Sequence, residues 1–197
     1  MGGCRPTTEG DFNVAITILA FVGSLRAASL NRQIAELAAQ VAPADVTVRI
    51  FDGLNELPFY NEEIDDAMTA VAPPLDPVVA LRSAGADADA ALVVTPEYNG
   101  SIPAVIKNAI DWLSRPFGAG ALKGKPLAVI GGSFGQYGGV WAHDETRKSF
   151  GIAGARVVES IKLSVPFKTL EGKAPAEHAE LSENVRDVVE KLVAEVG

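Results

Sequence analysis

Short apolar runs recur along the chain at intervals that suit β-strands. Each run is rich in β-branched residues and too short for a typical helix, which favours a strand. The runs lie at residues 15–22, 46–51, 90–95, 126–132 and 155–163. The first, third and fourth are almost continuously apolar, as expected of central strands in a parallel sheet. The second alternates, with Thr47 and Arg49 on its polar side, and therefore suits an edge of the sheet.

Segments of helical periodicity separate these runs. Apolar residues recur along them at three- and four-residue spacing, which marks one face of an amphipathic helix. The segments cover residues 34–41, 76–81, 105–113, 139–150 and 181–196. Asp76 followed by Pro77 predicts an N-cap and a first-turn proline for the second helix. The fourth segment is poorly amphipathic, because Trp141 and Phe150 flank a run of polar residues.

The strict alternation of strands and helices predicts a parallel sheet with helices on both faces. Right-handed crossovers place the helices there and give a three-layer α/β sandwich. A five-stranded sheet whose second strand alternates favours the strand order 2-1-3-4-5. We expect a single domain over residues 13–197, preceded by a disordered polar tail at residues 1–12.

Charge and cysteine content narrow the classes of function. A net charge of −8 argues against a nucleic-acid partner, because no basic stripe offsets phosphate repulsion. The apolar runs are too short to span a bilayer, so we expect no membrane segment. Cys4 is the single cysteine, which excludes an internal disulfide and indicates a reducing cytoplasm. With two histidines besides, a zinc cluster is not expected.

The predicted strand order directs attention to three loops. Ligands in open α/β sheets bind beyond the carboxyl ends of the strands, at the point where the strand order reverses. That point lies between the first and third strands, whose following loops cover residues 23–32 and 95–101. A glycine-rich loop, GGSFGQYGG at residues 131–139, follows the fourth strand and lies beside the second of these loops.

The first loop, GSLRAASLNR at residues 23–32, has the composition of an anion site. Ser24, Arg26, Ser29 and Asn31 supply polar side chains just ahead of a helix N-terminus. The loop matches neither the dinucleotide-binding GxGxxG fingerprint nor the GxxxxGK(S/T) pattern of a P-loop. The same residues also suit a plain strand-to-helix turn, with Ser29 or Asn31 as N-cap and Arg26 in solvent.

The second loop begins with the pentapeptide PEYNG, which is chemically richer than a connector needs. Pro96 fixes the backbone, while Asn99 and Gly100 permit positive φ, so that N–H groups can face the edge of a flat ligand. Tyr98 adds an aromatic face, and Ser101 can cap the helix that follows. The alternative is a rigid turn with Tyr98 packed on that helix.

Other motifs indicate no separate chemistry. The acidic run YNEEIDD at residues 60–66 lacks the spacing and glycine of an EF-hand loop, and is typical of a solvated loop. His143 has no serine or cysteine partner at a suggestive spacing, and the chain has no GxSxG elbow for a hydrolase. A response-regulator receiver would need an acidic pair where Gly23 and Ser24 stand.

Three segments together resemble the NADPH-dependent FMN reductase family, which includes bacterial chromate- and quinone-reducing members. They are GSLRAASLNR, PEYNGSIPAVIKNAIDWLSRP and GGSFGQYGG, and they match in order and spacing over most of residues 15–160. The resemblance implies a flavodoxin-like fold, bound FMN and reduction of a small-molecule acceptor by NAD(P)H. It also implies a homodimer or homotetramer with the flavin near a subunit interface.

The resemblance implies cofactor-binding roles position by position. The FMN phosphate would be held by Ser24, Arg26, Ser29 and Asn31. The isoalloxazine and its polar edge would be lined by Pro96, Glu97, Tyr98, Asn99, Gly100 and Ser101. The other side would be closed by Gly132, Ser133 and nearby backbone. No side chain is needed as a general acid or base, so we expect no catalytic residue and no metal.

Three positions depart from the family pattern. Ala104 replaces a common glycine, Trp141 stands where many relatives carry arginine, and His143 stands where they often carry glutamine. The last two lie in a region that tends to face the acceptor or the neighbouring subunit in the family. Acceptor preference and the subunit interface are therefore where we expect this chain to differ.

The resemblance implies a ping-pong reaction, in which NAD(P)H delivers hydride to FMN and leaves before a second acceptor enters the same slot. Quinones, free flavins, azo dyes and metal oxyanions are candidate acceptors. An electron-carrying flavodoxin is an alternative that the acidic charge would suit, although SLRAAS lacks the glycine of the usual flavodoxin phosphate loop. A flavin-binding module without turnover, its slot blocked by Trp141, is a third possibility.

Overall fold

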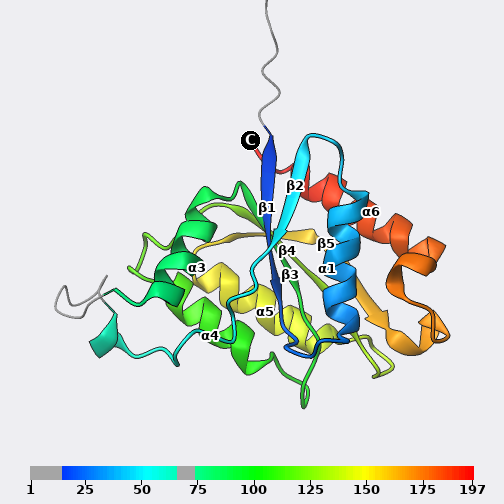
Figure 1. Cartoon of the computed structure of the whole chain (residues 1–197), viewed down its shortest axis with the longest axis horizontal. Coiled ribbons are helices and arrows are strands. Elements are labelled where there is room, and N and C mark those ends of the chain that lie inside the picture. Colours follow the sequence, from blue (N-terminus) through cyan, green and yellow to red (C-terminus); the bar gives the residue numbers. More distant parts are fainter. Residues whose placement is uncertain (1–14, 66–73) are drawn as a thin grey trace, which may run out of the picture.

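The computed structural model describes residues 15–65 and 74–197, so the predicted N-terminal tail lies outside the described residues. Within them, five parallel strands form one sheet (Figure 1). The strands are β1 (Ile16–Val22), β2 (Val46–Ile50), β3 (Ala90–Val94), β4 (Pro126–Ser133) and β5 (Arg156–Pro166). Their order, β2-β1-β3-β4-β5, confirms the predicted arrangement.

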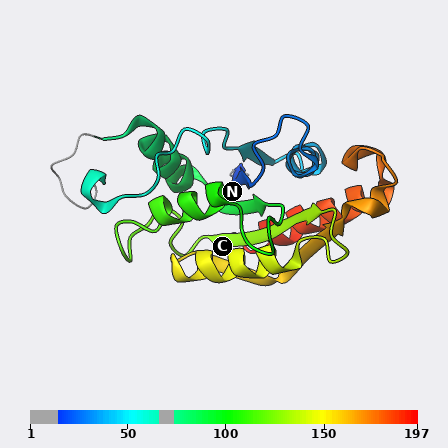
Figure 2. The same ribbon diagram turned by 90° about the horizontal axis from the view of Figure 1, so that it is seen from below.

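Helices cover both faces of this sheet. They are α1 (Leu30–Val41), α3 (Asp76–Asp87), α4 (Ala104–Leu113), α5 (Val140–Ile152) and α6 (Ala179–Val193). α1 and α6 pack on one face, whereas α3, α4 and α5 pack on the other (Figure 2). The result is the expected flavodoxin-like three-layer sandwich. Among the described residues, no helix is both long and apolar enough to cross a bilayer.

Most elements form where their apolar pattern predicts them. β1 and β3 are almost wholly buried, as central parallel strands should be, and the edge strand β2 keeps Thr47 and Arg49 exposed. On α1, the buried stripe that includes Ile34 and Leu37 faces the sheet. Burying each such aliphatic side chain contributes about 1.5–3 kcal/mol. Apolar packing therefore fixes α1 on the sheet.

Helix α5 departs from this pattern because its inner face is polar. His143, Thr146 and Arg147 are all buried there. Arg147 donates from Nη2 to the carbonyl of Val129 on β4 at 2.8 Å. Burial lowers the pKa of Arg147, and an ion pair with Asp144 at 2.8 Å opposes that shift. Hydrogen bonds therefore help to hold α5 on the sheet, whereas apolar contacts hold α1.

A polar network on α4 holds the long connection between β2 and α3. Asn108 accepts a hydrogen bond at Oδ1 from the N–H of Tyr60 and donates from its amide to the carbonyl of Pro58, both at 2.9 Å. The fully buried Trp112 donates from Nε1 to the same carbonyl at 2.8 Å. The helical part of the segment PEYNGSIPAVIKNAIDWLSRP therefore has a structural role, because it holds this connection against α4.

The acidic run within this connection is only partly solvated, contrary to the sequence-based expectation. Asp65 is fully buried and accepts two hydrogen bonds from the guanidinium of Arg82, at 2.8 and 2.9 Å. Its neighbour Asp66 lies outside the described residues. A carboxylate can be buried when a bidentate arginine compensates its lost hydration, and the sequence gives no sign of that distant partner.

Two predicted helix caps and one strand end were wrong. α3 begins at Asp76 itself and has Leu75 as its N-cap, without a side-chain cap. Ser101 does not cap α4, whose N-cap is Pro103, because its hydroxyl bonds elsewhere. β5 continues to Pro166, past a register shift opposite β4 that lengthens it.

Candidate functional site

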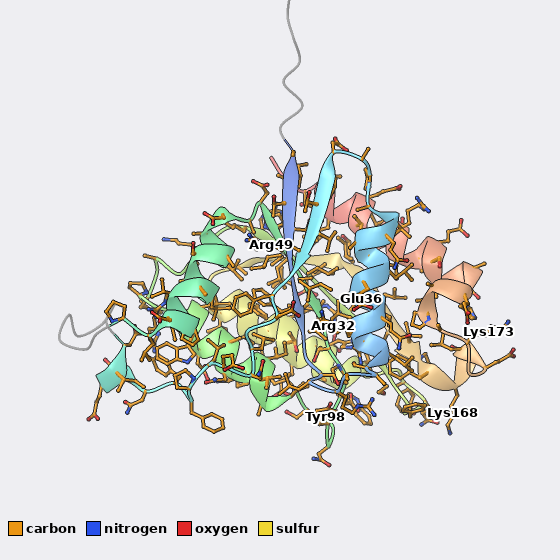
Figure 3. The ribbon with its side chains drawn as sticks, in the orientation of Figure 1. Arg32, Glu36, Arg49, Tyr98, Lys168 and Lys173 are labelled. Atoms are coloured by element: carbon orange, nitrogen blue, oxygen red, sulfur yellow. The ribbon has the colours of Figure 1, made fainter. Side chains whose placement is uncertain are left out.

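Three loops converge at the carboxyl edge of the sheet, where the strand order reverses. They follow β1, β3 and β4 and include the predicted binding segments. Figure 3 shows Tyr98 of the loop after β3 at this edge, with Arg32 near the start of α1 on the same side of the molecule. The predicted residues are therefore brought to one end of the fold.

The loop after β1 presents unpaired donors. In the part of the chain that the structure describes, the backbone N–H groups of residues 24–28 donate to no protein acceptor, and the exposed Arg26 forms no ion pair. Ser29 is the N-cap of α1, and its Oγ accepts from the N–H of Arg32 at 3.3 Å. Free N–H groups, a helix N-terminus and an unpaired guanidinium together favour an anion.

A cavity of about 630 Å³ opens beside this loop, toward the segment after β2. Ser24 and Arg26 line it on one side, and Asp52 and Asn55 line it on the other. Arg32 also borders it, but that guanidinium bonds to Asp52, and this hydrogen bond is the main cause that raises the pKa of Arg32. Of the two arginines that line the cavity, Arg26 is the one without an ion pair among the described residues.

The loop after β3 forms a tight turn of the kind its sequence predicts. Tyr98 and Ser101 exchange two backbone hydrogen bonds, each 3.1 Å long. The two residues between them both have positive φ, 53° at Asn99 and 73° at Gly100. An Asn-Gly pair is the usual choice for such a type I′ turn. Asn99 and Gly100 are exposed, and their backbone N–H groups have no acceptor among the described residues.

Side-chain contacts join the three loops. Tyr98 donates from its hydroxyl to Ser24 Oγ at 3.4 Å, which links the loops after β3 and β1. Asn31 donates to the carbonyl of Gly132 at 3.0 Å and accepts from its N–H at 2.8 Å, which links α1 to the end of β4. Asn31 is buried and does not line the cavity. The structure thus gives it a bracing contact in place of an open position.

Close packing at the strand ends depends on glycine and proline. A Cβ at Gly132 would lie 2.4 Å from the ring of Phe167, and a Cβ at Gly23 would lie 2.3 Å from Thr95 Oγ1. Pro96 is buried beside Gly23, so its role is to stiffen the loop from within. Ser133 accepts at Oγ from a nearby backbone N–H at 3.3 Å.

Two glutamates, one on the loop after β3 and one on helix α5, join these two elements by hydrogen bonds. Glu97 accepts at Oε2 from the N–H groups of Trp141 and Ala142, at 3.1 and 3.2 Å, and so caps the N-terminus of α5. Glu145, on α5, accepts from the hydroxyl of Ser101 at 2.7 Å. The predicted residues Glu97 and Ser101 therefore both hold the loop against α5.

His143 pins the same loop from beneath. Its Nε2 lies 2.9 Å from the carbonyl oxygen of Thr95, and its Nδ1 lies 2.7 Å from Ser164 Oγ on β5. Because a carbonyl can only accept, Nε2 carries the proton and Nδ1 accepts from the serine hydroxyl. Burial lowers the pKa of His143 to about 4, so the ring is neutral near pH 7.

Two of the positions that depart from the family pattern, His143 and Trp141, therefore differ in their exposure to solvent. His143 is fully buried, which corrects the expectation that it faces an acceptor or a neighbouring subunit. Trp141 is exposed and packs near the ring of Tyr137. Glu145 and Ser164 were missed because their partners lie far away in the sequence. No local pattern announces such contacts.

The chemistry of the site fits a bound FMN. Residues 24–28 and Arg26 offer donors for a phosphate, and the turn at Asn99 and Gly100 offers donors for a polar ring edge. The two regions are linked through Tyr98 and Ser24. A metal centre has no such support, since the described residues contain no group of three or more ligating His, Cys, Asp or Glu side chains.

Comparison with known proteins places this geometry in a family. The model of the NADPH-dependent FMN reductase family matches residues 16–169. A 2-hydroxy-1,4-benzoquinone reductase from a Burkholderia species is 42% identical over 134 residues, which are 68% of this chain and 69% of that protein. A quinone reductase from Pseudomonas putida is 42% identical over 133 residues, 68% of each chain.

A solved structure agrees over almost the whole molecule. The flavoenzyme FerB, an NAD(P)H:(acceptor) oxidoreductase from Paracoccus denitrificans, is 30% identical and superposes with a TM-score of 0.80. The match covers 92% of this chain and 97% of FerB. This chain therefore belongs to the NADPH-dependent FMN reductase family.

Proposed function

We propose that this oxidoreductase transfers two electrons from NAD(P)H, by way of bound FMN, to a quinone. FMN when bound supplies the hydride-accepting and hydride-donating chemistry. The overall reaction is balanced: NAD(P)H gives up a hydride, the quinone gains that hydride and one proton from solvent, and NAD⁺ or NADP⁺ and hydroquinone are released.

The observation that carries this proposal is the pairing of two donor sets across one edge of the sheet. The N–H groups of residues 24–28, with Arg26, suit a phosphate, while the turn at Asn99 and Gly100 suits the edge of a planar ring. Tyr98 bridges the two through Ser24. A molecule with a phosphate at one end and a flat polar heterocycle at the other uses both.

The predicted site residues then divide into two groups. Ser24 and Arg26 would contact the phosphate, and Tyr98 with the turn after it would contact the ring. Positioning residues make up the other group, because their polar atoms bond to parts of the protein outside these two donor sets. They are Ser29, Asn31, Glu97, Ser101, Gly132 and Ser133, with Pro96 stiffening the loop.

We infer a ping-pong order, in which the pyridine nucleotide leaves before the quinone enters the same slot. No side chain need move a proton in either step. His143 is buried with both ring nitrogens occupied, so it is unsuited to proton exchange with a substrate. The work of the chain is to orient the two reactants in turn.

Two other functions were open from the sequence, an electron-carrying flavodoxin and a flavin-binding module without turnover. Family membership and quinone-reducing relatives favour the reductase over both. The choice of NADH or NADPH, a homodimer or homotetramer, a cytoplasmic location, and azo, free-flavin or oxyanion acceptors remain predictions.

Anaerobic rapid mixing tests the proposal. Protein loaded with FMN should lose its yellow colour when mixed with NADPH or NADH, and should regain it when a benzoquinone is added. A flavin that stays yellow with both nucleotides would exclude the reductase and leave the electron carrier or the inactive module. Bleaching without recovery on adding quinone would contradict the quinone as acceptor.

A further inference from the structure

Two exposed aromatic rings lie together at the start of α5. Tyr137 is 55% exposed and Trp141 is 57% exposed, and their ring centroids are 5.6 Å apart at an interplanar angle of 56°. Rings of this size gain most from burial and from contact with other aromatic groups. A pair left in solvent is therefore typical of a surface that receives a ligand.

Trp141 is fixed against the turn that we propose to hold the ring edge of FMN. A Cβ at Gly100 would lie 3.9 Å from Cε3 of the indole, so the indole lies over that glycine. Its backbone N–H donates to Glu97 Oε2 at 3.1 Å. The tryptophan is thus held to the loop after β3 by its backbone, and its exposed ring lies beside the turn at Gly100.

The electrostatics of this corner disfavour an anion. The N-terminus of α5 would normally attract negative charge, but Glu97 already accepts from its N–H groups. Asp144 and Glu145 add two carboxylates on the same turn of the helix, and Arg147 is buried and paired with Asp144. A ligand at this corner therefore meets aromatic faces and carboxylates.

We propose that Tyr137 and Trp141 form an aromatic wall that selects neutral fused-ring quinones over single-ring quinones and metal oxyanions. This inference rests on the proposed quinone reductase function and names the substrate class of that same site. A two-ring quinone presents enough flat surface to touch the wall while its carbonyl ring lies over the turn. A single-ring quinone has less flat surface to place against the two rings, and an oxyanion has no flat face to offer.

The test compares acceptors on the FMN-loaded enzyme. The ratio of kcat/KM for menadione to kcat/KM for benzoquinone is measured in the wild type and in Tyr137→Ala, Trp141→Ala and Trp141→Phe, with chromate as a third acceptor. Phe134→Ala is the matched control, because Phe134 is 61% exposed but its ring packs edge-on against Phe167, 5.5 Å away.

We expect each alanine variant to lower the menadione-to-benzoquinone ratio by roughly three- to tenfold, the size of one lost aromatic contact. Trp141→Phe should recover most of the ratio, Phe134→Ala should leave it unchanged, and chromate should be the poorest acceptor of the wild type. If Trp141→Ala fails to fold, Tyr137→Ala and Trp141→Phe still decide the outcome.

Other results overturn the inference without touching the proposed function. A ratio unchanged in all variants would show that the wall does not contact the acceptor. A rise in turnover with every acceptor in Trp141→Ala would show that the indole obstructs the slot. A selective loss in the NAD(P)H half-reaction would assign the wall to the nicotinamide. Wild-type protein that binds no FMN, or does not oxidise NAD(P)H, would instead refute the proposed function itself.

Discussion

Helices α1 and α5 lie on opposite faces of the same sheet, yet they are held in different ways. α1 buries an aliphatic stripe that includes Ile34, and its polar side chains mostly face solvent. α5 buries His143, Thr146 and Arg147, and each of these makes a hydrogen bond in the interior. Apolar contacts fix a helix on a sheet but tolerate small shifts, whereas hydrogen bonds fix particular atoms.

The difference follows the position of the proposed site. α1 contributes its N-terminus and the Asn31 brace, while the inner face of α5 fixes the carbonyl of Thr95, three residues before Tyr98, where the turn begins. Buried polar groups are costly unless fully paired. His143 uses such a bond to fix the loop after β3 at the Thr95 carbonyl, while Arg147 bonds to β4 and Thr146 to its own helix.

The largest expected effect is the loss of stability when the apolar packing of α1 is disrupted. Ile34→Ala should lower the free energy of unfolding by about 2–5 kcal/mol, because it removes buried methyl groups and leaves a cavity. FMN affinity should change little, since Ile34 is not at the loops. Urea unfolding of the FMN-free protein measures the loss, with the exposed Gln40→Ala on the same helix as control. A loss below that of the control would contradict the packing account.

The polar inner face of α5 should make the stability of the protein depend on pH through His143. Unfolded histidine takes up a proton near pH 6.5, whereas burial holds folded His143 neutral down to about pH 4. The hydrogen bond to the Thr95 carbonyl and the charge of Asp144 oppose this lowering of the pKa, while the charge of Arg147 adds to it. The unfolded state therefore binds more protons between these values, and the protein should lose up to about 3 kcal/mol of stability as pH falls through this window.

His143→Gln should remove that part of the pH dependence, because glutamine can still donate to the Thr95 carbonyl but does not titrate. Urea unfolding of wild type and variant at about pH 5 and about pH 7 measures the difference. The comparison between the two proteins cancels the titration of the shared carboxylates. Equal slopes in both would contradict the assignment of a neutral, buried His143.

A third change addresses the anion site directly. Arg26→Ala should weaken FMN binding by roughly 1.5–3 kcal/mol, because it removes a charge-assisted contact to the phosphate. Titration of FMN into the flavin-free protein gives the dissociation constant. Arg49→Ala, an exposed arginine on the edge strand β2, is the matched control (Figure 3). An unchanged constant for Arg26→Ala would show that Arg26 does not hold the phosphate.

The smallest effect concerns the cap that joins the loop to α5. Glu97→Gln keeps the shape of the side chain but removes the charge that faces two N–H groups of the helix. We expect a loss of about 0.3–1 kcal/mol in unfolding free energy. Glu190→Gln, exposed on α6, controls for net charge. A larger loss in the control would refute the capping role.

The sequence predicted the fold because its signals are local. The stripe on α1 and the apolar runs of β1 and β3 repeat within a few residues, and the alternation of elements then limits the topology. The turn at Asn99 and Gly100 was also predictable, because an Asn-Gly pair favours positive φ at both positions.

The bracing of the site was not predictable in this way. Glu97 and Trp141 are 44 residues apart, as are Ser101 and Glu145, and Asn31 reaches Gly132 across 101 residues. Such pairs are distant along the chain and are brought together by the fold. The sequence therefore predicted which loops lie at this edge but not the bonds that join them, and contacts of Asn31, Glu97 and Ser101 with FMN stay predictions.

The central claim is that this edge of the sheet binds FMN, and a visible absorption spectrum tests it most directly. Purified protein is mixed with excess FMN, passed through a desalting column and scanned. We predict that it retains the flavin absorption bands in close to equimolar amount and that Arg26→Ala retains less. A colourless wild-type protein after desalting would contradict the account.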